Sequence, residues 1–121
     1  MPKIMIIEDD NSMRFLLGAL LQLEGYQVFE DNGCGENEGI IAVLERELPD
    51  IIFMDVHIGN KNGMDVLKLI RNNSVLNEVK VLMSSGMDLT DECIQGGANG
   101  FIMKPFTPED LIAQIKSLSA I

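Results

Sequence analysis

Residues that could carry out charge-driven chemistry follow four short apolar runs of the sequence. Acidic, hydroxyl and lysine side chains each come directly after such a run, and ligands bind at these positions when the runs are parallel strands of an open sheet. Carboxylates that lie close together repel one another and raise each other's pKa, so a divalent cation would relieve the repulsion. The groups are Glu8, Asp9 and Asp10; then Asp55; then Ser84, Ser85 and Gly86; and finally Lys104 and Pro105.

The acidic members of this set predict a metal site made only of oxygen ligands. Such a site suits Mg²⁺, which takes one or two carboxylates and otherwise water or phosphate oxygens. We expect Asp55 and Asp9 to be direct ligands and Glu8 to act through water. The main-chain carbonyl of His57 could reach the ion from the loop after Asp55. Asp10 is better interpreted as a helix cap, because acids are favoured at a helix N-terminus.

Strands and helices that alternate along the chain must position these groups. Continuous apolar runs predict strands covered on both faces, and apolar residues at helical spacing predict the helices between them. Thr107, Pro108 and Asp110 form a capping pattern that begins the last helix. The strands are Lys3–Ile7, Gln27–Glu30, Ile51–Met54, Val79–Met83 and Phe101–Met103; the helices run from Asp10 to Gly25, over about Glu38–Glu47, through Val66, Leu67 and Ile70, over about 89–96, and from Thr107 onward.

Five strand–helix repeats predict an α/β fold. Right-handed crossovers give a doubly wound (βα)5 three-layer sandwich, flavodoxin-like, whose parallel sheet has the order 2-1-3-4-5. In that order the first and third strands are neighbours at the switch point, so Glu8, Asp9 and Asp55 should converge. We expect residues 1–121 to be a single domain, since this length is close to the commonest domain size.

Composition narrows the classes of partner. With a net charge of −10, the protein lacks the cluster of basic residues that nucleic-acid binding needs, and anionic membranes would repel it. Cys34 and Cys93 make neither a disulfide framework nor a metal knuckle, and no apolar run reaches the length of a membrane span. With no signal peptide in the first residues, we expect a cytoplasmic protein.

Over essentially its whole length the chain resembles the receiver domains of bacterial response regulators, including the single-domain chemotaxis type. Each shared motif alone is weakly specific, whereas all five in order after the right strands are strongly specific. The motifs are Glu8 and Asp9 after the first strand, Asp55 after IIFM, the stretch GNKNGMDVLKLIR, Ser85 after VLMS, and Lys104, Pro105 and Phe106 before the last helix.

The resemblance implies a phosphoprotein of two-component (phosphorelay) signal transduction. Asp55 would accept a phosphoryl group from a histidine kinase or histidine phosphotransfer protein and form an aspartyl phosphate. Mg²⁺ and Lys104 would neutralise charge, and the Ser85 hydroxyl would donate to a phosphoryl oxygen. Ser85 would then move toward the phosphoryl group and Phe101 would turn inward, remodelling the face of the fourth helix, fifth strand and fifth helix. The domain would catalyse only its own phosphorylation and autodephosphorylation.

Several positions depart from the family's pattern or remain open. Gly59 stands where Pro is common, Ser85 replaces the more frequent Thr, and Phe101 lacks the hydroxyl of Tyr. Ser84 is the alternative to Ser85 as the hydroxyl that contacts the phosphoryl group. We prefer Ser85 because strand alternation places Ser84 one position earlier in the strand, and because Ser85 matches the motif. The side chain of His57 either tunes the lifetime of the phosphorylated state or is simply exposed. The segment 88–99 is about three residues shorter than the same segment in the chemotaxis type, which predicts a short or irregular fourth helix. The glycines in 33–39 leave the start of the second helix open.

Two other functions compete with the phosphoacceptor. A pseudo-receiver would keep the fold as a protein-interaction module without phosphorylation, although the complete acid, hydroxyl and lysine set argues against it. An aspartate-nucleophile phosphatase would need substrate-binding elements, and one His cannot build a general acid–base array.

Overall fold

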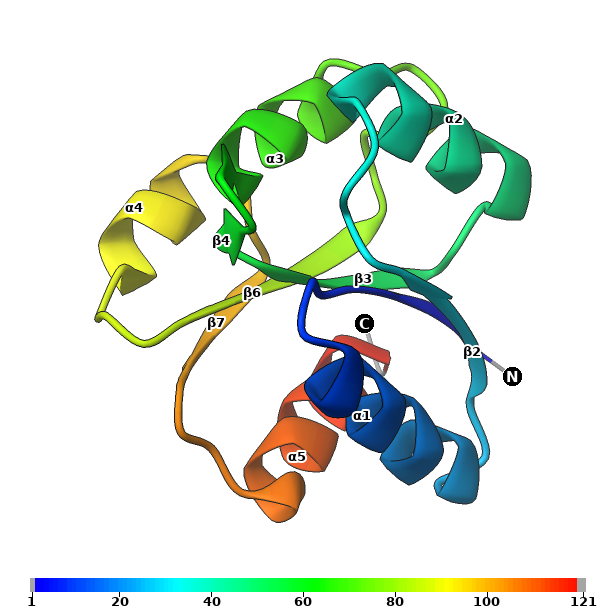
Figure 1. The fold of residues 1–121 in the computed structure, drawn as a ribbon, viewed down its shortest axis with the longest axis vertical. Helices are drawn as coiled ribbons and strands as arrows, with labels where there is room; N and C mark the ends of the chain where they lie inside the picture. The colour runs from blue at the N-terminus through cyan, green and yellow to red at the C-terminus, as the bar shows by residue number, and fades with distance from the viewer. Residues whose placement is uncertain (1, 120–121) are drawn as a thin grey trace.

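The central layer of the molecule is a five-stranded parallel sheet in the order β2-β1-β3-β6-β7, which confirms the predicted order 2-1-3-4-5. The computed structural model describes residues 2–119 (Figure 1). The sheet strands are β1 (Lys3–Ile7), β2 (Gln27–Asp31), β3 (Ile51–Asp55), β6 (Lys80–Ser85) and β7 (Gly100–Met103); the helices are α1 (Asn11–Leu23), α2 (Asn37–Glu47), α3 (Gly63–Arg71), α4 (Thr90–Gln95) and α5 (Pro108–Ser119).

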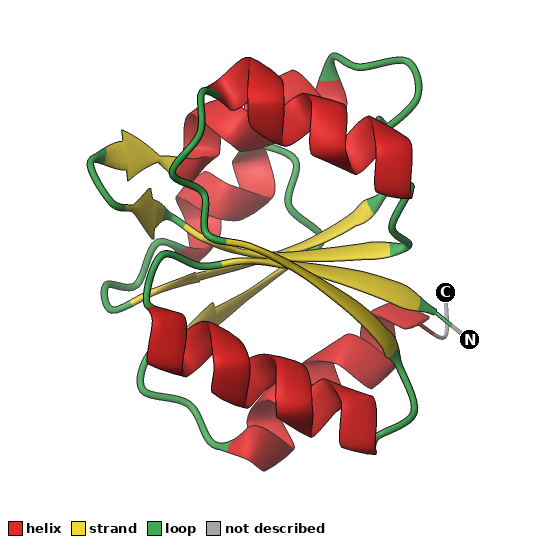
Figure 2. Ribbon diagram, turned by 45° about the vertical axis from the view of Figure 1, so that its right-hand side comes forward, coloured by secondary structure: helices red, strands yellow, loops and turns green. Residues whose placement is uncertain are grey.

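Helices cover both faces of the sheet, which makes the predicted three-layer sandwich (Figures 1 and 2). Alternate residues of a strand point to opposite faces, so each central strand contributes to two separate cores. On one face Met54 and Met83 pack with the buried sides of α2, α3 and α4. On the other face Phe53 and Leu82 pack with α1 and α5. Within residues 2–119, no helix has both the length and the apolar character needed to cross a lipid bilayer.

Both predicted helix N-caps are confirmed. The Asp10 carboxylate accepts a hydrogen bond from the Met13 amide at 2.9 Å, and the Thr107 hydroxyl accepts one from the Asp110 amide at 3.1 Å. Each cap satisfies one of the amides that a helix leaves without a partner at its start. The caps fix where α1 and α5 begin, a few residues after Glu8 and Asp9 in one case and after Lys104 in the other.

Two segments at the carboxyl end of the sheet differ from the prediction. β6 was expected to end at Met83, but it continues through Ser84 and Ser85 because both residues pair with β7. The loop after Asp55 contains a short antiparallel hairpin of β4 (His57–Ile58) and β5 (Lys61–Asn62). Strands of two residues carry no readable periodicity, so the sequence could not reveal them.

The two segments that the sequence left open have definite conformations. In 33–39, Gly33 has a φ of 72°, its amide donates to the Asp31 carboxylate at 2.7 Å, and α2 begins at Asn37. In 88–99, α4 has only six residues, Thr90–Gln95. The expected shortness of the fourth helix is therefore confirmed.

Candidate functional site

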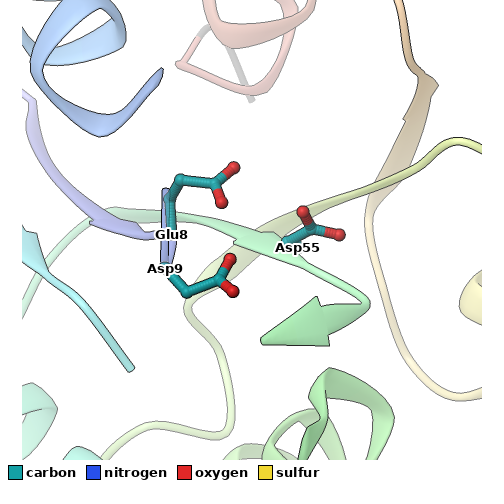
Figure 3. Close-up of side chains that lie close together, drawn as sticks. All are labelled: Glu8, Asp9 and Asp55. Carbon is teal, nitrogen blue, oxygen red and sulfur yellow. The ribbon is translucent and has the colours of Figure 1, made fainter. Parts of the chain in front are cut away.

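Three carboxylates meet where β1 and β3 end. Glu8 and Asp9 follow β1, Asp55 is the last residue of β3, and these strands are hydrogen-bonded neighbours. One oxygen atom from each carboxylate lies within 4.8 Å of the others. Figure 3 shows the Glu8 side chain directed toward α1 and α5 and the Asp9 side chain directed toward β4. An all-oxygen cluster of this kind could hold a hard divalent cation such as Mg²⁺.

Lys104 supplies a cation to the same cluster. Its ammonium Nζ donates to the Asp55 carboxylate and, at 3.1 Å, to Glu8 Oε1. Its main-chain amide donates to the carbonyl of Ser85 at 2.8 Å, and its peptide bond to Pro105 is cis. Glu8 is 2% exposed and Asp55 is 8% exposed, so this charge pairing is only weakly screened by solvent.

The surroundings shift the pKa values of Glu8, Asp9 and Lys104 in different directions. Burial is the largest cause that raises the pKa of Glu8, while a hydrogen bond shared with Glu8 lowers the pKa of Asp9. Burial acts to lower the pKa of Lys104, but Asp55 and Glu8 together outweigh it, and the pKa of Lys104 is raised. The Lys104 ammonium therefore stays charged, and the lowered pKa of Asp9 makes it a more readily ionised partner for a metal than Glu8.

The hairpin β4–β5 closes one side of the cluster. The Gly59 amide donates to Asp9 Oδ2 at 2.9 Å, and the His57 amide donates to Asp55 Oδ1 at 3.1 Å. The Lys61 ammonium donates to the Gly33 carbonyl at 2.9 Å, which ties the hairpin to the loop after β2. The His57 side chain is exposed, and a contact between its carbonyl and an ion stays a prediction.

The hydroxyl and aromatic residues lie on two neighbouring strands of the same edge. Ser85 is 1% exposed, and its hydroxyl oxygen accepts a hydrogen bond from the Met87 amide at 3.2 Å. Ser84 stands beside Asp55 in the pairing of β6 with β3. Phe101, on β7, is partly buried and packs against the core that α2, α3 and α4 cover. The structure thus places Ser85 and Phe101 on neighbouring strands, β6 and β7, and their switching roles stay predictions.

Arg14 belongs to the surroundings of the site, and the sequence reasoning missed it. Its guanidinium donates to the main-chain carbonyl of Glu8 at 2.7 Å and to the Asn11 side chain at 2.6 Å. Nε lies 3.6 Å from the Glu30 carboxylate. Arg14 is the only charged residue of α1, and this isolation within an apolar helix was the available signal. The contact fixes the peptide from which both Glu8 and Asp9 project.

Sequence comparisons identify relatives across nearly the whole chain. The family described as "Response regulator receiver domain" matches residues 4–116. The transcriptional regulatory protein PdtaR of Mycobacterium tuberculosis is 30% identical over 114 residues, which cover 94% of this chain and 55% of that protein. The probable transcriptional regulator ycf27 of Porphyridium aerugineum is 29% identical over 119 residues, or 96% of this chain and 47% of the relative. The chain thus spans about half the length of the curated relatives it matches.

Solved structures agree in fold. The chemotaxis response regulator CheY4 of Vibrio cholerae superposes with a TM-score of 0.86 at 26% identity, covering 98% of each chain. The receiver domain of NtrX from Brucella abortus, at 23% identity, shares the fold with a TM-score of 0.83, over 95% of this chain and 96% of that one. With its parallel sheet and its acidic cluster at the end of β1 and β3, the chain belongs to the response regulator receiver domain family.

Proposed function

We propose that this chain is a phosphoacceptor of two-component signal transduction, with Asp55 as the residue that is phosphorylated. The observation that carries the proposal is the Lys104 ammonium, which joins Asp55 to Glu8 at the one cluster of carboxylates found among residues 2–119. A nucleophilic carboxylate held beside a fixed positive charge is the arrangement that phosphoryl transfer needs, because this reaction depends on positioning and charge neutralisation.

The reaction is a displacement at phosphorus. A carboxylate oxygen of Asp55 forms a bond to phosphorus while the bond from phosphorus to the donor breaks, and the electron pair of that bond leaves with the donor. Receiver domains partner with histidine kinases, so the donor would be a phosphohistidine of a histidine kinase or of a histidine phosphotransfer protein. The donor imidazole leaves as the neutral ring after taking a proton from solvent.

The residues around Asp55 divide the work of neutralising charge. Mg²⁺, held by Asp55, Asp9, Glu8 through water and the His57 carbonyl, would neutralise the phosphoryl oxygens and align them with Asp55. Lys104 binds a phosphoryl oxygen from the other side, within reach of its present position on Asp55. The Ser85 hydroxyl donates to a phosphoryl oxygen and gives up its bond from Met87.

The switch follows from the movement of Ser85. When the Ser85 hydroxyl moves toward the phosphoryl group, Phe101 turns inward and remodels the face formed by α4, β7 and α5. A surface pocket on this side of the molecule is lined by Phe101, Met103 and Phe106. A conformational change at Phe101 would therefore alter a surface that a partner protein could bind. The downstream target, or an output domain in a longer protein, would recognise that change.

Residues 1–121 would make up a single receiver domain with a cytoplasmic location. The reduced thiols of Cys34 and Cys93 fit such a setting. Phe15 and Leu16 on α1 are 74% and 53% exposed, and Leu16 lines an apolar groove that also includes Lys104 and Phe106. An apolar surface beside the phosphorylation site supports docking of the phosphodonor protein there.

A small-molecule phosphodonor tests the proposal without a cognate kinase. Incubation with acetyl phosphate and Mg²⁺ should add the mass of one phosphoryl group to the wild type, and hydroxylamine should remove it, since it cleaves acyl phosphates. Asp55→Asn should abolish the addition. Asp65→Asn, which changes an exposed acid on α3, is the matched control and should be labelled normally. A wild type that gains no mass, or an Asp55→Asn variant that gains it fully, would refute the assignment and favour a pseudo-receiver.

A further inference from the structure

Ser84 carries a buried hydroxyl group that no other group satisfies. Its side chain is 0% exposed, and its Oγ has no hydrogen-bond partner. Within residues 2–119, the other buried side-chain atom in this condition is Oδ1 of Asn37, at the start of α2. A buried polar group without a partner costs free energy, and a role in catalysis or binding is one reason for a native protein to keep such a group.

The sheet places this hydroxyl against the phosphorylation site. Ser84 pairs with Asp55 of β3 on one side and with Ile102 of β7 on the other. Paired residues of neighbouring parallel strands lie about 4.8 Å apart and point to the same face. Phe53, Leu82 and Ile102 all belong to the core beneath α1 and α5. Residues two positions further along therefore share that face, and they are Asp55, Ser84 and Lys104.

Ser85 has the opposite orientation. Alternation puts it on the face of Met83, which packs with α2, α3 and α4. Its hydroxyl already accepts a hydrogen bond from Met87. The two adjacent serines thus lie on opposite faces of the sheet, with Ser84 on the face of Asp55, and of these two hydroxyls only that of Ser84 lacks a partner.

The Lys104 ammonium has a need that Ser84 can meet. An ammonium group has three N–H donors, and the carboxylates of Asp55 and Glu8 take two of them. Both carboxylates also belong to the cluster that could hold a cation. Once a cation and a phosphoryl group engage those oxygens, the ammonium loses the partners that now hold it over the site.

We propose that the Ser84 hydroxyl is a positioning group that accepts a hydrogen bond from the Lys104 ammonium while Asp55 is being phosphorylated. The inference rests on the proposed function of Asp55. Ser84 does not touch the reacting atoms; it holds Lys104 within reach of the phosphoryl oxygens after Glu8 has turned to the metal. Its hydroxyl can rotate to present a lone pair, and its position beside Asp55 puts it on the same face as the lysine.

A pair of nearly isosteric variants tests the hydroxyl itself. Ser84→Thr keeps the hydroxyl, whereas Ser84→Val has the same shape without it. The maximal rate of phosphorylation, measured by intact mass at saturating acetyl phosphate and Mg²⁺, should fall about threefold to tenfold in Ser84→Val and Ser84→Ala. The maximal rate of Ser84→Thr should stay within about twofold of the wild-type rate, because this variant keeps the hydroxyl.

Two further measurements separate positioning from packing. The Kd for Mg²⁺, from a titration without phosphodonor, should be unchanged in Ser84→Ala, because Ser84 does not bind the ion. The melting temperature of Ser84→Ala without Mg²⁺ should be equal to or above that of the wild type, because the variant removes an unsatisfied hydroxyl. A slower reaction in a protein that is no less stable is the signature of the proposed role.

Each contrary result has a distinct meaning. Equal rates for Ser84→Thr and Ser84→Val would overturn the inference, as would a rate loss that follows a lowered melting temperature in all three variants. A wild type that is phosphorylated normally beside an equally fast Ser84→Ala would remove the role of Ser84 and leave the proposed function intact. A wild type that takes no phosphoryl group would instead remove the proposed function on which the inference rests.

Discussion

Single charged groups at the end of β1 and β3 determine what the site can bind. Three carboxylates face one ammonium there, so an excess of negative charge remains in a place that solvent screens poorly. Lys104 lowers that excess without removing it. The cluster should therefore attract a small cation of high charge and still leave the ammonium available for an anionic group.

Close approach of the backbone of Asp55 favours glycine at position 63, at the start of α3. A Cβ at this position would lie well inside van der Waals contact with the main-chain carbonyl oxygen of Asp55. We expect Gly63→Ala to lower the free energy of unfolding by about 1–3 kcal/mol, because the backbone of Asp55 and Val56 or the start of α3 must shift. Urea denaturation followed by circular dichroism measures the change.

A matched substitution in α2 should have the opposite sign. Gly39 is exposed, and a Cβ there would meet no atom within 4 Å. Gly39→Ala should stabilise the protein by about 0.5 kcal/mol, since alanine costs less conformational entropy in a helix. If both alanines changed stability equally, steric crowding by the Asp55 carbonyl would not be the cause of the loss at Gly63.

The two cysteines should differ sharply in reactivity. Cys93 is buried, and burial together with the nearby Glu92 raises the pKa of its thiol. Because alkylation requires the thiolate, a raised pKa lowers the reactive fraction at pH 8. Iodoacetamide should therefore modify only Cys34 in the folded protein and both cysteines in urea, as read by peptide mass mapping. Rapid labelling of Cys93 under native conditions would contradict the burial of α4 against the sheet.

The sequence predicted residues that face the site and missed residues that support it. Glu8, Asp9, Asp55 and Lys104 were found because each follows an apolar strand, and parallel strands bring their ends together. Arg14 was missed because its partner at the site is a main-chain carbonyl, and the isolation of Arg14 in an apolar helix does not identify that partner. The missing partner of the Ser84 hydroxyl depends on the packing of the folded chain, so no sequence pattern could show it.

At the scale of elements, one side chain joins three segments at the far end of α3. Arg71 donates to the carbonyls of Gly97 at 2.8 Å and of Val79 at 2.8 Å, and to the side chain of Asn99 at 2.9 Å. It also donates to the Asn77 carbonyl at 3.1 Å. Burial lowers the pKa of Arg71 somewhat, but the guanidinium remains charged. α3 is thereby held to the loops that enter β6 and β7.

Removing this guanidinium should be costly. Arg71→Met should lower the free energy of unfolding by about 2–4 kcal/mol, because several carbonyl groups lose a charged donor at once. Arg71→Lys should recover only part of the loss, since one ammonium cannot reproduce the fork geometry. Lys68→Met, an exposed position on the same helix, is the control and should change stability by less than about 0.5 kcal/mol. Equal effects of Arg71→Met and Lys68→Met in urea denaturation would show that the bonds contribute little.

Elements of four or more residues were predictable, and the two-residue strands β4 and β5 were not. The central strands have continuous buried runs, and α1 and α5 carry capping residues, so their type and order followed from the sequence. β6 extends past its last apolar residue because Ser84 and Ser85 pair with β7, and only tertiary pairing decides that. α2 ends at Glu47, as predicted, and the next residue, Leu48, lies in the left-handed region at φ 49°.

At the scale of the whole molecule, metal binding should raise thermal stability. A ligand that binds only the folded state stabilises it by RT ln(1 + [L]/Kd), which is about 2.7 kcal/mol at one hundred times Kd. For a domain of this size that corresponds to a rise in melting temperature of roughly 5–15 °C. A thermal melt in Mg²⁺, compared with a melt at equal ionic strength in NaCl, measures the shift.

The acidic cluster must be the origin of that shift. Asp9→Asn and Asp55→Asn should each remove most of the rise, because each deletes a proposed direct ligand. Asp65→Asn should preserve it, since this acid lies on the exposed side of α3. If Mg²⁺ stabilised all of these variants equally, the ion would act through the general negative charge of the protein, whose net value is −10.

The bond from Gly59 to Asp9 has a consequence for the hairpin that carries it. Asp9 is held by the amide of Gly59, and the hairpin is held in turn by Lys61 to the carbonyl of Gly33. An ion that moves the Asp9 carboxylate would therefore strain or relax the hydrogen bond from Gly59. Through the hairpin, that movement is linked to the bond between Lys61 and Gly33 in the loop after β2. If a partner binds the loop after β2, the ion changes the affinity for that partner by some factor. Thermodynamic reciprocity then requires that the partner change the affinity for the ion by the same factor.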